Sequence, residues 1–211
     1  MTERDFIENI IDLYKVAPDL KFNNKNYSIT RGAKHNISSQ AEDLFAVFVA
    51  EALDDENLKF LINYTLSYSS KGQKSSSFKP DLAVLQNGII THIFDLKMDL
   101  GFRRDYQTDT TFQNAEKRFL EFRKNKTVVD NKKKHFKALV STNIINQIVV
   151  ITTENGGTKS FQKNLKKEFE NYDWTNIYYL TSDFHPNNCK NKPKVNTDEF
   201  QRLLEDARKN L

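Results

Sequence analysis

Two carboxylates and a lysine stand at the ends of two neighbouring apolar segments of the sequence. Pro80-Asp81 precedes the segment LAVLQ, and Asp95-Leu96-Lys97 ends the segment IITHIFDLK. Because alternate residues of an extended strand share a face, the side chains of Asp95 and Lys97 should point the same way. Two carboxylates at adjacent strand ends form a hard oxygen site that suits Mg²⁺, and the backbone carbonyl of Leu96 can add a third oxygen.

This set of groups is suited to the hydrolysis of a phosphodiester bond. A bound metal ion lowers the pKa of a water molecule and neutralises charge in the transition state. Lys97 can orient that water or add positive charge to the same transition state. The reaction requires no covalent intermediate, so no side chain has to act as a nucleophile.

The turn between the two apolar segments decides whether the carboxylates can share a metal ion. Gln86-Asn87-Gly88 favours a β-hairpin. If only its last two residues form the turn, Asp81 and Asp95 fall on opposite faces of the sheet. We therefore predict a three-residue turn over the whole segment, or else a β-bulge within the strands.

The short motif occurs more than once in the chain. Asp19-Leu20-Lys21 and Asp130-Asn131-Lys132 have the same spelling, but neither ends an apolar strand. Placement therefore singles out Asp95 and Lys97. The structural alternative is that Asp81 caps a turn while Asp95 and Lys97 form a surface ion pair.

The spacing of apolar residues predicts the elements that must position these groups. A helix starts near Ser38 or Ser39 and ends at Asp54-Asp55. The other helices are expected over residues 3–15, 102–124, 158–171 and 197–209, the last capped by Thr197. Strands are expected over 60–68, 144–152 and 176–180 and on both sides of the 86–88 turn, with a basic connection over 127–139. This order predicts a mixed sheet flanked by helices.

Residues 38–153 resemble the PD-(D/E)XK nuclease superfamily, which includes many type II restriction endonucleases and the archaeal Holliday-junction resolvases. The matching residues are Glu42 in a helix, then Pro80-Asp81, then Asp95-Leu96-Lys97. The resemblance implies an α/β fold with a restriction-endonuclease-like core (αβββαβ), in which a central mixed β-sheet is flanked by helices. It also implies that Asp81 and Asp95 bind Mg²⁺, for which Mn²⁺ can substitute, and that Lys97 is the catalytic lysine.

The resemblance makes Glu42 the helix acid that touches the metal directly or through water. Ser39-x-x-Glu42 is also a capping box, in which Glu42 would fold back on the helix N-terminus. Glu51, on the opposite flank of the helix, is the other candidate for this acid.

Basic residues near these segments are candidates for phosphate contacts. Solvation of a surface helix or loop is the alternative for each of them. The candidate nucleic-acid-binding residues are Lys71, Lys74, Arg103, Arg104, Lys132, Lys133 and Lys134.

Composition agrees with a single nuclease domain over residues 1–211, divided into an N-terminal helix and loop (1–37), a catalytic core (38–153) and a C-terminal β/α extension (154–211). The net charge of +4 permits nucleic-acid binding without demanding it. Cys189 is the one cysteine, which fits a reducing cytoplasm. No apolar run is long enough for a transmembrane helix, so we expect no membrane partner.

The leading hypothesis is a Mg²⁺-dependent DNA endonuclease, a metal-dependent deoxyribonuclease of the type II restriction class. It would cut double-stranded DNA as a homodimer. A structure-selective or repair nuclease, such as a junction resolvase or an exonuclease, is the alternative within the same chemistry. A non-catalytic DNA-binding protein on a nuclease fold is the alternative of another class.

Overall fold

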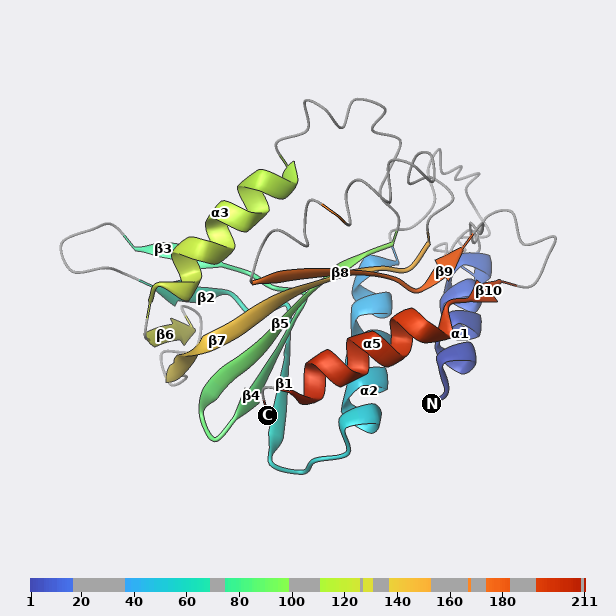
Figure 1. The fold of residues 1–211 in the computed structure, drawn as a ribbon, viewed down its shortest axis with the longest axis horizontal. Coiled ribbons are helices and arrows are strands. Elements are labelled where there is room, and N and C mark those ends of the chain that lie inside the picture. The colour runs from blue at the N-terminus through green and yellow to red at the C-terminus, as the bar shows by residue number, and fades with distance from the viewer. Residues whose placement is uncertain are drawn as a thin grey trace, which may run out of the picture.

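A computed structural model of the 211-residue chain describes residues 1–16, 37–68, 75–98, 111–125, 127–130, 137–152, 167, 174–182, 193–209 and 211. They form a mixed α/β fold in which helices flank a central sheet (Figure 1). The helices are α1 (Glu3–Val16), α2 (Ser38–Leu53), α3 (Thr111–Arg123) and α5 (Thr197–Arg208). Within the described segments, no helix combines the length and the apolar character needed to cross a bilayer.

The central sheet has the strand order β1-β4-β5-β7-β6-β2-β3, and β8 also pairs with β7. Its pairing is mixed, since β4 and β5 are antiparallel whereas β5, β7 and β8 are parallel. A separate two-stranded sheet joins β9 and β10. The strands are β1 (Leu58–Ile62), β2 (Leu66–Tyr68), β3 (Ser76–Phe78), β4 (Leu82–Gln86), β5 (Ile89–Lys97), β6 (Thr127–Asp130), β7 (Lys137–Val150), β8 (Thr175–Tyr179), β9 (Thr181–Ser182) and β10 (Lys194–Val195).

Two hydrophobic cores lie on the two faces of the sheet. On one face, α1, α2 and α5 bury a cluster of aromatic rings that includes Phe45, whose ring lies 5.5 Å from that of Phe94 on β5. On the other face, Phe119 and Phe122 of α3 pack with Ile93, the neighbour of Phe94 along β5. Ile93 and Phe94 point into different cores, and this alternation fixes the faces to which Asp95, Leu96 and Lys97 point at the end of β5.

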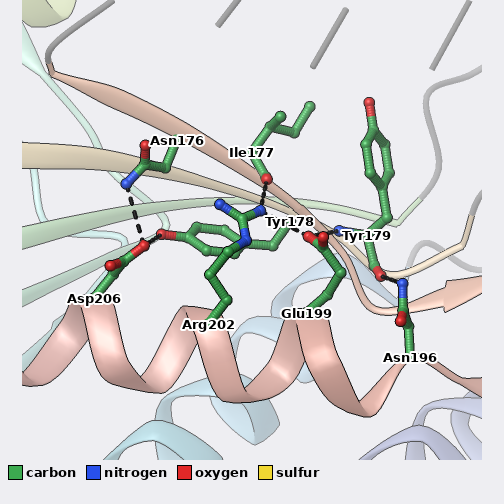
Figure 2. A network of polar contacts seen from close by, with 8 residues as sticks. All are labelled: Asn176, Ile177, Tyr178, Tyr179, Asn196, Glu199, Arg202 and Asp206. Atoms are coloured by element: carbon green, nitrogen blue, oxygen red, sulfur yellow. Dashed lines mark hydrogen bonds and ion pairs between the residues drawn. The ribbon is translucent and has the colours of Figure 1, made fainter. Parts of the chain in front are cut away.

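The outer edge of β8 is covered by polar side chains from α5 and from the residue before it (Figure 2). Arg202 donates a hydrogen bond to the carbonyl of Ile177, and the N–H of Tyr179 donates to Glu199 Oε2 at 3.3 Å. Asn196 donates to the carbonyl of Tyr179 at 3.1 Å. These bonds satisfy backbone groups that an unpaired edge strand would otherwise offer to another chain.

Several predicted elements are confirmed. The first helix, the second helix with its end at Asp54, the strand near residue 176 and the closing helix all form as expected. Asn196 rather than Thr197 is the N-cap of α5, so the predicted cap is wrong. The described part of the 102–124 helix is α3. The helix predicted over 158–171 lies outside the described residues except for Lys167.

Two predictions about the strands are wrong. The 60–68 segment is not one strand, because it breaks at Asn63 and its halves join distant positions of the sheet as β1 and β2. The 127–139 segment is not simply a basic connection, because it contains β6 and the start of β7. Val128 of β6 is buried, and at the start of β7 the exposed Lys137 precedes the buried Ala138, so a lysine hid a strand with one solvated face.

Acid is expected to destabilise the fold through His92, which is fully buried on β5. Burial lowers the pKa of His92 from 6.5 to about 4. Between these values the unfolded chain binds the extra proton and the folded chain does not, so stability falls as the pH drops through this window. The free energy of unfolding should decrease by up to roughly 3 kcal/mol from this group.

Urea denaturation of the wild type and of His92→Gln, measured across this pH window, would check the prediction. The variant should show the shallower dependence on pH, whatever its stability at neutral pH. Equal slopes for the two proteins would contradict it.

Candidate active site

The hairpin between β4 and β5 has a two-residue turn. Asn87 and Gly88 both have positive φ angles, 51° and 79°, as a tight turn of this kind requires. Gln86 consequently pairs with Ile89. The predicted three-residue turn is therefore wrong.

The predicted alternative, a β-bulge within the strands, is confirmed. Leu85 pairs with Ile90, but Val84 pairs with His92, so Thr91 is an extra residue on β5. The Thr91 hydroxyl donates a hydrogen bond to the carbonyl of Val84 at 3.3 Å, across the shifted register. One inserted residue reverses the parity of everything that follows it along the strand.

The bulge brings the two carboxylates to the same face of the sheet. The shifted register pairs Leu82 with Phe94, and its next step places Asp81 opposite Asp95. Leu82 and Phe94 point into the core of α1, α2 and α5. Asp81 and Asp95, as their neighbours, lie on the opposite face, the one that α3 covers further along the strands.

Asp81 is held close to both β5 and the second carboxylate. Its Oδ2 accepts a hydrogen bond from the N–H of Leu96 at 2.7 Å. Burial and the nearby charge of Asp95 raise the pKa of Asp81 to about 7, against the opposing effects of the Leu96 N–H and of Lys97. The two carboxylates repel each other in this partly buried position. A divalent cation bound to both would relieve that repulsion, and carboxylate oxygens are suitable ligands for it.

Lys97 extends this cluster on the same face of β5. Its Nζ lies 2.5 Å from Asp95 Oδ1, and the two side chains are 37% and 26% exposed. The ammonium is thus close to the carboxylates and still open to solvent. This arrangement confirms that Asp95 and Lys97 point the same way.

The carbonyl of Leu96 faces the same side of β5 as Asp81. In an extended strand the N–H and C=O of one residue point to one side, and successive residues alternate. The carbonyl of Lys97 accepts a hydrogen bond from the N–H of Ile151, beyond the end of β7, at 2.9 Å. The peptide groups of Leu96 therefore face β4, where its N–H meets Asp81 and where the site requires a third oxygen.

Glu42 lies on α2, the helix that packs on the face of the sheet opposite Asp81 and Asp95. The capping box does not form, because α2 begins at Ser38 with Ile37 as its N-cap. The side chain of Glu42 instead accepts a hydrogen bond from Asn63 Nδ2. Among the described residues, no group of three or more His, Cys, Asp or Glu side chains is placed to hold a metal ion, so Glu42 does not complete a three-carboxylate site.

Glu51, the other candidate for the helix acid, lies elsewhere. It is in the last turn of α2, roughly 13 Å from Glu42 along the helix axis. Its carboxylate forms an ion pair with the N-terminal ammonium of Met1. This contact gives Glu51 a structural partner away from the carboxylate pair.

Asn63 is a residue of the site that the sequence did not single out. It follows β1, has a positive φ of 55°, and its N–H donates to the carbonyl of Asp81 at 3.0 Å. An asparagine inside an apolar run was a signal for a break in the strand, because asparagine tolerates the left-handed conformation.

The candidate nucleic-acid-binding residues lie outside the described residues. They are Lys71, Lys74, Arg103, Arg104, Lys132, Lys133 and Lys134. Their contacts with phosphate stay predictions. No family model, curated protein or solved structure matches the chain, so the geometry of the site carries the functional argument.

Proposed function

We propose that this protein is a Mg²⁺-dependent DNA endonuclease of the type II restriction class. The observation that carries the proposal is the bulge at Thr91, which gives Asp81 and Asp95 a common face at adjacent strand positions. A hairpin with the same turn and no bulge would have separated them. The resemblance of residues 38–153 to PD-(D/E)XK nucleases supports the same chemistry.

The donor set fits Mg²⁺. Asp81 and Asp95 supply hard carboxylate oxygens, and the carbonyl of Leu96 faces the same side. Asn63 links Glu42 to the backbone of Asp81, because its side chain donates to Glu42 and its N–H donates to the Asp81 carbonyl. Mg²⁺ bound there would polarise the scissile phosphate and acidify a water molecule. Burial and the charge of Asp95 raise the pKa of Asp81, and the repulsion between the two carboxylates favours cation binding once both are ionised.

Lys97 contributes positive charge on the same face. Its ammonium contacts Asp95 and is 37% exposed, so it can also reach a substrate oxygen or the attacking water. A charge that is held in place before the reaction stabilises negative charge as it develops on the phosphate. Asp95 thus orients the lysine in addition to supplying an oxygen.

The choice of substrate rests on the resemblance. Double-stranded DNA fits a restriction-type nuclease, and a homodimer would present two such sites to the two strands of a symmetric sequence. The basic residues predicted to contact phosphates belong to this part of the proposal.

Incubation of the purified protein with supercoiled plasmid and Mg²⁺ tests the function, with EDTA in place of Mg²⁺ as the control. We expect metal-dependent cleavage into discrete fragments. Cutting that requires a branched or damaged substrate would instead assign a structure-selective or repair nuclease. Tight binding of DNA without cleavage, with either Mg²⁺ or Mn²⁺, would overturn the enzymatic proposal and favour a non-catalytic DNA-binding protein.

A further inference from the structure

Asn63 connects the two parts of the candidate site that come from different layers of the fold. Its backbone N–H donates to the carbonyl of Asp81 at 3.0 Å, which continues the β1–β4 pairing by one step. Its side-chain amide donates to Glu42 Oε2 on α2. One residue therefore contacts both the strand that carries Asp81 and the helix that carries Glu42.

The backbone conformation of Asn63 makes this double contact possible. Its φ of 55° is left-handed, and it ends β1 immediately after Ile62. A left-handed residue turns its side chain away from the alternation of the strand. Asparagine adopts this conformation more readily than other residues with a side chain, and it also carries an amide donor.

We propose that Asn63 is a positioning residue that ties Glu42 to the strand end carrying Asp81 and so tunes the metal affinity of the Asp81–Asp95 site. This inference rests on the proposed function. The amide is a neutral donor, so it holds the Glu42 carboxylate in place without neutralising the negative charge that a cation would attract. The backbone N–H of the same residue donates to the carbonyl of Asp81, so Asn63 links the two acids.

Substitution of the amide tests this role without removing a proposed metal ligand. Asn63→Gly keeps the left-handed conformation accessible and keeps the N–H to Asp81, but it removes the donor to Glu42. Asn87→Gly is the matched control, since Asn87 has a similar φ of 51° but lies in the turn at the other end of β4. Asn63→Asp is a second variant that keeps the size of the side chain and replaces the donor with a repelling carboxylate.

Mn²⁺ is the probe, because its binding can be followed by electron paramagnetic resonance without any cleavage. We expect Asn63→Gly to weaken Mn²⁺ binding and to slow DNA cleavage by about 10- to 100-fold, as for other residues that orient metal ligands. Asn63→Asp should weaken binding at least as much. Glu42→Ala should lower the affinity too, and combining it with Asn63→Gly should add little, because either change removes the same contact between Asn63 and Glu42.

Urea denaturation separates this role from a structural one. Asn63→Gly and Asn87→Gly should lose similar stability, yet only Asn63→Gly should lose Mn²⁺ affinity. Equal Mn²⁺ affinity in the wild type and both Asn63 variants would overturn the inference and leave the proposed function intact. Mn²⁺ binding without DNA cleavage by the wild type would overturn only the proposed function, whereas a wild type that binds no Mn²⁺ would overturn both.

Discussion

Asp81→Asn and Asp95→Asn should each lower the rate of Mg²⁺-dependent DNA cleavage by about 10³-fold or more, which corresponds to roughly 4 kcal/mol of transition-state stabilisation. The two carboxylates face each other across adjacent strands, and each substitution leaves one of them alone. An amide keeps the size of the side chain but removes the charge that holds a divalent cation. Initial rates of plasmid cleavage over a range of Mg²⁺ concentrations would measure the loss.

The same substitution at Asp81 should not harm the metal-free fold. Burial and the charge of Asp95 raise the pKa of Asp81 to about 7, so its contribution to stability is present below about pH 4 and is lost as the pH rises through 7. At pH 8 in EDTA the ionised carboxylate opposes folding. Asp81→Asn removes that charge, and its oxygen can still accept the N–H of Leu96, so its Tm should equal or exceed that of the wild type.

Asp130→Asn is the control for motif spelling. Asp130 belongs to another Asp-x-Lys triplet, and the expectation that this triplet does not end a strand is wrong, because Asp130 ends β6. Its partner there is Leu66 of β2, not a second carboxylate. Its substitution should leave Mg²⁺-dependent cleavage unchanged. A loss of activity in Asp130→Asn comparable to that in Asp95→Asn would contradict the assignment of the site to β4 and β5.

The amphipathic helices could be predicted because their periodicity is a property of the sequence alone. The apolar residues Phe6, Ile7, Ile10 and Ile11 recur at helical spacing, and all four are buried in α1. The same reasoning found α5 and the start and end of α2. Local periodicity therefore gave the helices that cover one face of the sheet.

The bulge could be required but not located from the sequence. A shared metal ion requires Asp81 and Asp95 on one face of the sheet, so the register between their strands had to shift by one residue. Either a longer turn or a bulge could supply that shift. The Asn-Gly turn closed as its sequence favours, so the shift occurred inside the strand, at Thr91. The contact between the Thr91 hydroxyl and the carbonyl of Val84 depends on pairing that residue spacing does not reveal.

The strand assignments failed where tertiary context overrode local pattern. The 60–68 run has strand-like alternation on both sides of Asn63, and nothing local shows that its two halves join distant positions of the sheet. Lys137 obscured the start of β7, because exposed residues alternate there with the buried Ala138 and Val140. The contact of Glu42 with Asn63 was equally inaccessible, since it joins residues 21 positions apart and replaces a local capping interaction.

Lys97→Gln should separate catalysis from metal binding. We expect cleavage to slow by about 10²- to 10³-fold, the usual effect of removing one positioned group that stabilises charge in the transition state. Mn²⁺ affinity should be unchanged or higher, because the ammonium that lies 2.5 Å from Asp95 Oδ1 competes with a cation for that carboxylate. Lys59→Gln, at an exposed lysine on β1, is the matched control and should alter neither quantity. If Lys97→Gln lost Mn²⁺ affinity in proportion to its loss of cleavage, the lysine would act by holding Asp95 in place and not through the substrate or the attacking water.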